Sequence, residues 1–503
     1  MISGEKTFKA IDETIKNTKA ELKKSEISTI ISISAGTATV SGLENVKMAE
    51  LLEFEGGVSG MVQTLDRDSV GVVFINKPDN LKAGDRAKRT NRVLDVPVGD
   101  NLLGRVVNSL GEPLDGKSPI VSKMRRAVEV DAYAIMDRAP VDEPLQTGIK
   151  AIDAFTPIGR GQRELILGDR QTGKTAIAVD AIINQKNSGV ISIYCAIGQR
   201  NSAVAGVIAE LKKADVMQNC VVVCAGADDT AGMQYIAPYA ATSIGEHFLE
   251  QGKDVLIVYD DLTNHARAYR EMSLLLRCPP GREAFPGDIF YIHSRLLERS
   301  TKLSSELGGG SLTSLPIVST EAGNISAYIP TNIISITDGQ IYLSTSLYQR
   351  GILPAIDTGR SVSRVGGDAQ LPAYKSLVGP LKLFYSQFEE LESFTKFGTQ
   401  LDKETMGRLN RGKAIRAILE QKQYSPMKAS DQIAVFSATN AGLFDNMSAQ
   451  NIKKAEQIVC EVFNLHFKDL IRNINNSKKI SAEQAEKMIE AFSQALNSTD
   501  WEQ

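Results

Sequence analysis

The spacing of hydrophobic and polar positions changes along the chain and indicates several distinct regions. Residues 1–25 are rich in Lys, Glu and Ala and contain no proline, which predicts a polar helix that needs another surface to dock on. Over 26–95, short runs that alternate apolar and polar residues, such as 31–34 and 37–40, are separated by glycines. Short strands with regular turn signals predict a small β-barrel.

Residues 96–370 alternate short apolar runs with helical patterns. The predicted strands cover 165–167, 190–197, 220–225 and 255–259, and the predicted helices cover 175–185 and 233–251. Apolar strands that alternate with helices predict a parallel sheet covered on both faces. Helical periodicity dominates 371–503, which predicts a terminal bundle. The expected fold class is therefore α/β, with an N-terminal small β-barrel and a C-terminal α-helical bundle.

Composition and charge narrow the function classes. The 503 residues include 57 Lys plus Arg and 60 Asp plus Glu, a net charge of −3, which is too balanced for a nucleic-acid-binding tail or a polybasic membrane anchor. No apolar run approaches the ~18 residues of a membrane span, and the start lacks the pattern of a signal peptide. Five scattered cysteines argue against a disulfide framework.

One glycine-rich segment carries the chemistry of phosphate binding. It fits the pattern G-x-x-x-x-G-K-[ST] and consists of Gly168, Asp169, Arg170, Gln171, Thr172, Gly173, Lys174 and Thr175. It follows an apolar strand and opens a helix, which is the context that a P-loop requires. The glycines let backbone N–H groups point at phosphate oxygens, and the helix N-terminus adds positive potential. We expect Lys174 to reach the β- and γ-phosphates of ATP and the Thr175 hydroxyl to bind Mg²⁺.

Two neighbouring strand ends supply further candidates. Asp260 follows the apolar run 255–259, so we expect it to hold Mg²⁺ through water. Asp261 is equally suited to capping the next helix. Gln199 follows the run 190–197, where an ATPase often has a carboxylate that acts on the attacking water. Glutamine cannot take a proton from water, which predicts tight binding and slow turnover, although some GTPases orient water with Gln.

Together these motifs resemble the α subunits of F-type ATP synthases, and the resemblance covers nearly the whole chain. Its marks are the P-loop, AIGQR at 196–200, YDDL at 259–262, PPGREA at 279–284, PAIDTGRSVSR at 354–364 and QYSPM at 423–427. The related β subunits have Gly-Glu-Arg where this chain has Gly-Gln-Arg at 198–200. That difference separates the non-catalytic subunit from the catalytic one, and the resemblance implies a RecA-like P-loop NTPase core.

The resemblance also implies partners, cofactors and a location. Three α and three β subunits would alternate in a ring around a rotating central-stalk γ subunit. Peripheral-stalk δ and b subunits would hold the ring, and a membrane sector would move protons or sodium ions as ATP is made or hydrolysed. The α sites would hold ATP with Mg²⁺ permanently, while chemistry occurs at the β sites. The chain would be a peripheral protein on the cytoplasmic side of the inner, energy-coupling membrane.

Individual residues take on roles through the same resemblance. Arg364 matches the residue that α lends to a neighbouring β site, where it would act in trans as an arginine finger. Ser361 and Ser335, the latter expected at a strand end, match contributors to the same interface. Gln421 and Gln423 match positions that contact adenine in the α site.

The chain departs from the family pattern beside the expected adenine site. Most α subunits have Gly-Ile-Arg-Pro where this chain has Gly-Ile-Leu-Pro at 351–354, so Leu353 removes a charge and several donors. Arg360 stands where an apolar residue is common, and Asp357 where Asn is common. These features resemble an alternate, divergent branch of F-type ATPases thought to move sodium.

Two alternatives remain open on the sequence. A homohexameric secretion or RNA-translocating ATPase would need a catalytic carboxylate where Gln199 stands. An RNA helicase would also need basic and stacking aromatic residues, whereas aromatic residues make up 6% and Trp501 is the single tryptophan. A regulatory scaffold with an inert bound nucleotide would tolerate the loss of Arg364.

Overall fold

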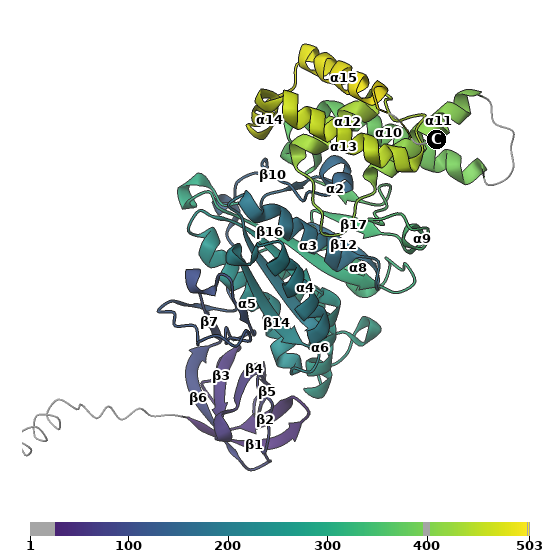
Figure 1. The fold of residues 1–503 in the computed structure, drawn as a ribbon. Coiled ribbons are helices and arrows are strands. Elements are labelled where there is room, and N and C mark those ends of the chain that lie inside the picture. The colour runs from purple at the N-terminus through teal and green to yellow at the C-terminus, as the bar shows by residue number, and fades with distance from the viewer. Residues whose placement is uncertain (1–25, 396–402, 500, 502–503) are drawn as a thin grey trace, which may run out of the picture. The chain divides into compact units, whose positions relative to one another are not determined.

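The computed structural model describes residues 26–395, 403–499 and 501, so the helix expected over 1–25 lies outside the described residues. The chain divides into two compact units, Met1–Val93 and Leu94–Gln503. In the first unit, strands close into a barrel in the order β1-β2-β5-β4-β3-β6 (Figure 1). The barrel strands are β1 (Ile27–Ser34), β2 (Thr37–Ser41), β3 (Glu50–Phe54), β4 (Ser59–Leu65), β5 (Val70–Phe74) and β6 (Arg86–Val93).

The barrel encloses its own apolar core. Val40, Leu52, Val72 and Phe74 are fully buried in one cluster, because alternate residues of a strand face the inside of a barrel. Gly60 of β4 lies against this cluster, and a Cβ there would be 2.5 Å from Val72 Cγ1. The predicted small barrel is therefore confirmed as part of the fold class.

The second unit is built on an eight-stranded sheet in the order β18-β17-β12-β16-β15-β13-β14-β8. Its strands are β8 (Val106–Val107), β12 (Leu165–Asp169), β13 (Ile191–Gln199), β14 (Cys220–Gly226), β15 (Asp254–Asp260), β16 (Ser311–Thr320), β17 (Gly339–Leu343) and β18 (Val362–Ser363). Neighbouring strands are parallel, except that β18 runs antiparallel to β17. The carboxyl ends of the parallel strands therefore meet at one edge of the sheet.

Helices cover both faces of this sheet (Figure 1). The helices that contact its strands are α3 (Lys174–Asn184), α4 (Asn201–Lys213), α5 (Ala231–Leu249), α6 (Leu262–Leu275) and α8 (Tyr328–Ile336). The same unit also contains α7 (Ile289–Leu297) and α9 (Thr345–Gln349). Tyr194 and Val258 share a core cluster with residues of α3 and α4. On the other face, Gly245 of α5 lies so close that a Cβ would be 3.3 Å from Ile193 Cδ1. Residues 193 and 194 thus face opposite sides, as strand geometry requires.

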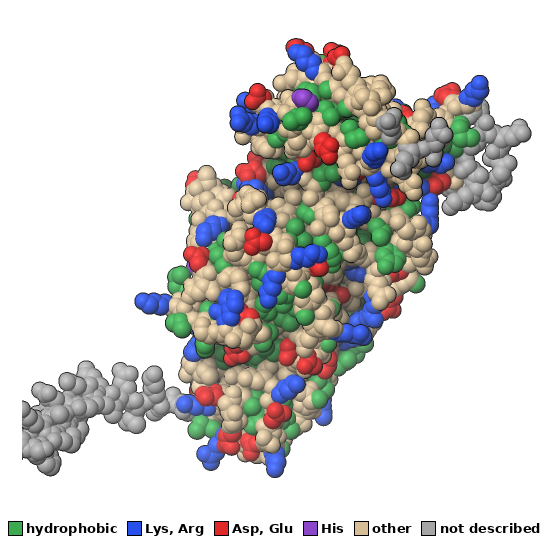
Figure 2. Space-filling model, in the orientation of Figure 1, with side chains coloured by type: hydrophobic (Ala, Val, Ile, Leu, Met, Phe, Trp, Pro, Cys, Tyr) green, Lys and Arg blue, Asp and Glu red, His purple; other side chains and the backbone are tan. Residues whose placement is uncertain are grey.

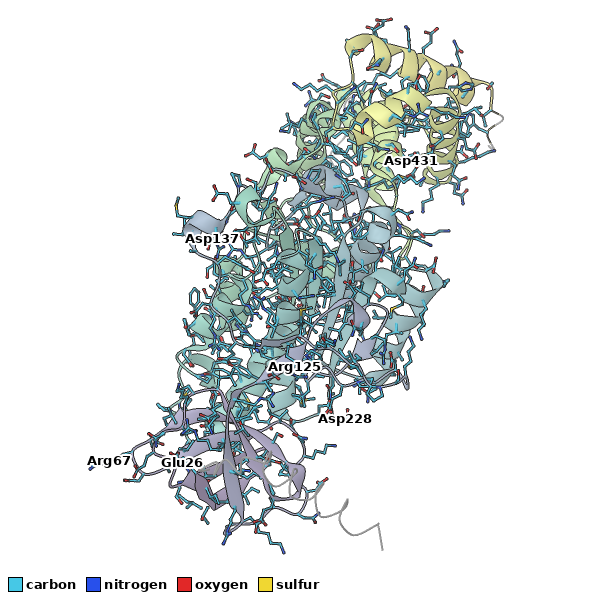
Figure 3. All side chains as sticks on the ribbon, turned by 90° about the vertical axis from the view of Figure 1, so that its left-hand side faces the viewer. Glu26, Arg67, Arg125, Asp137, Asp228 and Asp431 are labelled. Carbon is cyan, nitrogen blue, oxygen red and sulfur yellow. The ribbon has the colours of Figure 1, made fainter. Side chains whose placement is uncertain are left out.

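The second unit also contains two small sheets and the terminal helices. The small sheets pair β7 (Asp95–Pro97) with β9 (Arg125–Ala127) and β10 (Pro144–Leu145) with β11 (Ile158–Gly159), and α2 (Lys150–Phe155) lies between β10 and β11 in the chain. The terminal helices are α10 (Pro372–Thr395), α11 (Lys403–Leu419), α12 (Ala429–Asn440), α13 (Ala449–His466), α14 (Lys468–Asn475) and α15 (Ala482–Asn497). Asp431 of α12 accepts a hydrogen bond from Asn464 of α13 at 2.9 Å (Figure 3).

The α/β fold class with its helical bundle is confirmed, but several elements were not foreseen. The sequence pattern did not predict β16, β17 or α14. Among the described residues, no helix combines the length and the apolar character that crossing a membrane requires. On the face shown in Figure 2, basic and acidic side chains are interspersed, without one continuous basic patch.

The packing of α10 on α11 depends on a glycine. A Cβ on Gly412 would lie 2.0 Å from Phe388 Cγ, so we expect Gly412→Ala to lower the free energy of unfolding by about 1–3 kcal/mol through overpacking. For Gly407 of the same helix, no atom of the described residues outside the helix's own backbone lies within 4 Å of the Cβ position, and Gly407→Ala should stabilise by up to about 1 kcal/mol. Denaturant unfolding of both variants checks this, and equal stabilities would contradict it.

Candidate nucleotide-binding site

The P-loop lies at the carboxyl end of β12, between the ends of β16 and β17. Gly168 has φ 158°, and a Cβ there would lie 2.6 Å from the carbonyl oxygen of Leu343. Gly173 has φ 99° and directly precedes α3. Both glycines are therefore required by the close approach and the turn, and the loop ends on the N-terminus of a helix, as the motif predicts.

Lys174 is the buried cation of the loop, with 7% of its surface exposed. Its Nζ donates to the carbonyl oxygen of Gly168 at 2.9 Å and to that of Asp169 at 2.5 Å. Burial lowers the pKa of Lys174, while the charges of Asp261 and Asp260 act in the opposite direction. An ammonium held among backbone carbonyls gains strongly from an anion, so this position suits a phosphate group.

Asp260 is the buried acid of the site, and three side chains donate hydrogen bonds to it. They are Thr175 Oγ1 at 2.7 Å, Tyr194 OH at 2.8 Å and Gln199 Nε2 at 2.9 Å. Burial raises the pKa of Asp260, and the hydrogen bonds from Thr175, Tyr194 and Gln199 act against that rise. The Thr175 hydroxyl and the Asp260 carboxylate are hard oxygen ligands that fit Mg²⁺, with phosphate oxygens and water completing its shell. When bound, the ion would neutralise charge on the phosphates.

Asp261 begins α6. Its Oδ1 accepts a hydrogen bond from the backbone N–H of Asn264 at 2.8 Å, and its Oδ2 accepts one from Ser319 Oγ at 3.0 Å. Burial and the neighbouring Asp260 raise the pKa of Asp261 to about 6. The helix-capping interpretation of Asp261 is confirmed, because its side chain satisfies a backbone donor of the first helical turn.

Asp169 fixes the shape of the P-loop through residues far along the chain. Its Oδ1 accepts from Thr320 Oγ1 at 2.6 Å and from the N–H of Gly323 at 2.8 Å, and its Oδ2 accepts from Thr345 Oγ1 at 2.8 Å. Burial alone would raise the pKa of Asp169, but these hydrogen bonds leave it below its ordinary value. Thr320, Thr345 and Tyr194 were not predicted from the sequence, because no local motif marks them.

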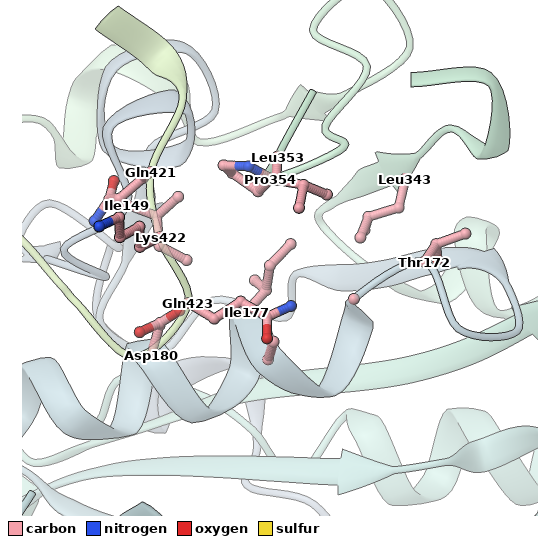
Figure 4. A pocket seen from close by; sticks show the side chains of 12 residues that line it. Ile149, Thr172, Ile177, Asp180, Leu343, Leu353, Pro354, Gln421, Lys422 and Gln423 are labelled. Carbon is pink, nitrogen blue, oxygen red and sulfur yellow. The ribbon is translucent and has the colours of Figure 1, made fainter. Parts of the chain in front are cut away.

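A pocket continues from the P-loop along α3 (Figure 4). Its lining consists of Ile149, Thr172, Gly173, Ala176, Ile177, Asp180, Leu343, Leu353, Pro354, Gln421, Lys422 and Gln423. Leu353 and Pro354 lie across the pocket from Ile177 of α3. Its mostly apolar walls with a few polar groups are typical of a small-molecule site. The position next to the phosphate loop makes it the candidate site for a nucleotide base.

The two glutamines of this pocket differ in their surroundings. The Gln421 side chain donates to the carbonyl oxygens of Gly148 and Ser425, both at 2.8 Å, and accepts from the N–H of Lys150 at 3.1 Å. Both N–H donors of its amide are therefore used within the protein. Gln423 is exposed at the rim.

Arg364 lies far from the P-loop, at the edge of the sheet that the amino ends of the parallel strands form. It directly follows β18, and its N–H donates to the carbonyl oxygen of Asp338 at 2.8 Å. The N–H of Asp338 in turn donates to the carbonyl oxygen of Arg163, at the amino end of β12. Five residues of extended chain, about 17 Å, separate Arg163 from Gly168. The Arg364 side chain is exposed, so the structure does not bring it to its own P-loop.

The two predicted serines lie in different settings. Ser361 is buried, donates to the carbonyl oxygen of Asp357 at 2.6 Å and accepts from the N–H of Tyr342 at 3.0 Å. It shapes the turn that leads to Arg364. The expectation that Ser335 ends a strand is wrong, because it lies in helix α8 and donates to the carbonyl oxygen of Asn332 at 2.7 Å. The β-branched run around it resembles a strand, but its buried residues Ile329, Ile333 and Ile336 have the spacing of one helix face.

Behind Arg364 lies a buried acid. Glu164 is fully buried, and its Oε2 accepts from Gln162 Nε2 at 2.7 Å. The same Nε2 donates to Ser363 Oγ at 3.1 Å. Among the described residues, Oε1 of Glu164 has no hydrogen-bond partner. Burial raises the pKa of Glu164 well above its ordinary value, while Gln162 and the charge of Arg364 act to lower it.

A parallel sheet with this loop, a buried Lys and a Thr–Asp pair at its carboxyl edge defines a P-loop nucleotide-binding protein. Family models agree and extend over most of the chain. They match the beta-barrel domain of the ATP synthase alpha/beta family over 24–91, its nucleotide-binding domain over 148–363, and the C-terminal domain of the ATP synthase alpha/beta chain over 370–495. The chain therefore belongs to the ATP synthase alpha/beta family.

Individual relatives show that the chain is similar to the alpha subunits of this family. The chain is 53% identical over 492 residues to ATP synthase subunit alpha 2 of Syntrophus aciditrophicus, covering 98% of this chain and 95% of the relative. It is 56% identical to ATP synthase subunit alpha 2 of Syntrophotalea carbinolica, covering 96% and 92% respectively. It is also 56% identical to ATP synthase subunit alpha 1 of Marinomonas sp., covering 95% and 94%. The predicted resemblance to α subunits is confirmed.

Removing the buried cation should weaken phosphate binding. We expect Lys174→Ala to weaken Mg-ATP binding by about 100-fold, because charge-assisted hydrogen bonds to phosphate are lost. Lys186→Ala is the control, since this exposed lysine pairs with exposed Asp215 at 3.3 Å and contributes little. Titration calorimetry of both variants checks the prediction, which fails if Lys174→Ala binds Mg-ATP as tightly as wild type.

Glu164 should make stability depend on pH. Below the ordinary Glu range the carboxyl is protonated in both the folded and the unfolded chain. As pH rises, Glu164 ionises first in the unfolded chain, because its pKa is raised in the folded protein. The wild type therefore loses stability with rising pH, whereas Glu164→Gln does not. The melting temperature of Glu164→Gln should therefore exceed that of wild type more at about pH 8 than at about pH 5. Exposed Glu306→Gln is the control, and a pH-independent difference would contradict the prediction.

Proposed function

We propose that the chain is a non-catalytic subunit that binds ATP with Mg²⁺ and lends Arg364 to the catalytic site of an adjacent β subunit. Ser361 and Ser335 belong to the same interface, Ser361 by shaping the turn before Arg364. The P-loop residues and Gln199 bind nucleotide, Thr175 and Asp260 bind Mg²⁺, and Gln421 and Gln423 border the base. The reaction at the β site is ATP synthesis or hydrolysis, coupled to ion transport.

One observation carries this proposal: Arg364 is exposed at the sheet edge opposite to the P-loop of its own chain. The separation of about 17 Å along β12 exceeds the reach of an arginine side chain. An Arg in this place cannot stabilise charge on its own nucleotide, but it can enter a site on a neighbouring subunit. A planar guanidinium beside a γ-phosphate stabilises the transition state of phosphoryl transfer.

Gln199 supports the non-catalytic assignment. Its amide donates to Asp260 at 2.9 Å, at the strand end where a catalytic carboxylate would be expected. Gln199 thereby stabilises the carboxylate that would hold Mg²⁺, and it has no basic group to accept a proton from water. These contacts favour retention of nucleotide over turnover and disfavour the homohexameric ATPase.

The assembly follows from membership of the family. The proposed partners are a β subunit in an alternating ring, the central-stalk γ subunit, the peripheral-stalk δ and b subunits and the membrane sector, with no nucleic acid. The chain would lie peripherally on the cytoplasmic side of the energy-coupling membrane. The proposed domain plan is a docking helix over 1–25, a barrel over 26–95, a nucleotide-binding domain over 96–370 and a bundle over 371–503.

Arg364 provides the test. In a complex reconstituted with its β partner, we expect Arg364→Ala to reduce ATP hydrolysis by about 10³-fold or more while Mg-ATP binding to the α chain alone is unchanged. Arg360→Ala is the matched control, because Arg360 is exposed in the same turn and pairs with Asp357 at 3.7 Å. Hydrolysis is measured by phosphate release at saturating ATP.

Two outcomes would contradict the proposal. Normal turnover by the Arg364→Ala complex would show that this Arg is not lent to the catalytic site. Rapid hydrolysis by the chain alone would show that its own site is catalytic and would favour the homohexameric motor.

A further inference from the structure

The turn that carries Arg364 is anchored to the residues that precede β12. The N–H of Arg364 donates to the carbonyl oxygen of Asp338 at 2.8 Å. The Asp338 carboxylate in turn accepts two hydrogen bonds from the Arg163 guanidinium, at 2.8 and 2.9 Å. Ser363 Oγ accepts from the N–H of Gly366 at 3.0 Å and closes the turn around Arg364. Hydrogen bonds therefore hold the backbone from which the exposed Arg364 side chain extends.

Gln162 connects this turn to the buried acid Glu164. Gln162 is fully buried, and its Oε1 accepts from the N–H of Gly159 at 2.8 Å. This bond directs Nε2, which carries two donors, toward Glu164 Oε2 at 2.7 Å and Ser363 Oγ at 3.1 Å. Both polar atoms of the Gln162 side chain are thus used, and the acceptor on Glu164 helps to keep the amide turned toward Ser363.

A glycine makes room for the Glu164 carboxyl beside the strand pair that leads to Arg364. Gly339 of β17 lies opposite Ser363 of β18. A Cβ on Gly339 would lie 2.5 Å from Glu164 Oε2 and 2.9 Å from its Oε1. The carboxyl therefore lies against the backbone that pairs with the residue before Arg364.

Stability alone does not account for an acid in this place. Glu164 is fully buried, and among the described residues its Oε1 has no hydrogen-bond partner. A buried polar atom without a partner lowers the free energy of unfolding, and an apolar side chain would avoid that cost. The charge of Arg364 acts to lower the pKa of Glu164, against the effect of burial. The carboxyl and the guanidinium therefore interact, which connects the buried acid to the proposed catalytic arginine.

We propose that Glu164 is a positioning residue for Arg364, which holds, through Gln162 and Ser363, the turn from which the guanidinium reaches the catalytic site of the neighbouring subunit. The inference rests on the proposed function, in which Arg364 acts in trans. Misplacement of a catalytic group by about 1 Å can cost about 100-fold in rate. A long exposed side chain also loses conformational freedom when it enters a site, and a backbone that is already held in place lowers that cost.

ATP hydrolysis by the complex reconstituted with its β partner provides the test. Glu164→Met removes the acceptor for Gln162, and we expect kcat to fall by about tenfold to 100-fold with KM unchanged. Glu164→Gln keeps an oxygen that can accept from Gln162 and should retain most of the wild-type kcat. Mg-ATP binding to the chain alone should be unchanged in both variants, because Glu164 precedes β12 and the P-loop lies at the other end of that strand.

The Arg364→Ala background shows whether the effect passes through the arginine. In this background the guanidinium is already absent, so the addition of Glu164→Met should cause no further loss of turnover. Radiolabelled ATP makes the low rates of these complexes measurable. If Glu164→Met does not assemble, Glu164→Asp takes its place in both backgrounds, because its carboxyl is one methylene further from Gln162, and the same results are expected.

The matched control is Gln185→Met, which removes another buried and hydrogen-bonded side chain. Gln185 Nε2 donates to the carbonyl oxygens of Gln146 at 2.8 Å and Ala181 at 2.9 Å, both outside the turn that carries Arg364. This variant should keep the wild-type kcat in the assembled complex. A loss as large as that of Glu164→Met would show general damage to the fold and would overturn the inference.

The remaining outcomes separate this inference from the function on which it rests. Wild-type kcat in Glu164→Met, together with loss of turnover in Arg364→Ala, overturns the role of Glu164 and leaves the proposed function standing. An equally large effect of Glu164→Met in the wild-type and Arg364→Ala backgrounds also overturns that role, as does a Glu164→Gln complex as slow as Glu164→Met. If Arg364→Ala itself turns over at the wild-type rate, the proposed function fails together with the inference.

Discussion

The direction of the parallel strands is the constraint on which the rest of this structure depends. Because β12, β13, β15 and β16 end at one edge of the sheet, the P-loop, Gln199 and Asp260 are brought together there. β18 runs antiparallel to β17 and ends at the other edge, and Arg364 follows it. One sheet therefore separates a nucleotide site from an exposed arginine, and that separation requires any role of Arg364 at a phosphate to involve a second subunit.

The nucleotide site is held in shape by neutral donors around buried charges. Lys174 is hydrogen-bonded to backbone carbonyls, and Asp260 accepts from a hydroxyl, a phenol and an amide. Charges in such surroundings are costly unless they find partners of opposite sign. A magnesium nucleotide would supply both partners: its phosphates would pair with the ammonium of Lys174, and its metal would pair with the carboxylate of Asp260. Gln199 completes this arrangement without introducing a group that could activate water.

The sequence predicted the parts of the site that lie within one strand–loop–helix unit. The P-loop, Thr175 and Asp260 could be found because glycines, an apolar run and a helix start are local signals. The partners of Asp169 could not, because Thr320 and Thr345 lie more than a hundred residues away, and they end or follow strands β16 and β17, which the pattern did not predict. Ser335 was misplaced because a run of isoleucines is compatible with either a strand or a buried helix until its packing is known.

Under the proposed function, this chain binds one nucleotide and acts on another. The most direct measurement is a high-resolution structure of the chain assembled with its β partner and a transition-state analogue of phosphoryl transfer. We expect the Arg364 guanidinium to lie within hydrogen-bond distance of the analogue bound to the β subunit, while the chain's own nucleotide contacts Lys174. Arg364 pointing into solvent, away from every bound phosphate, would contradict it.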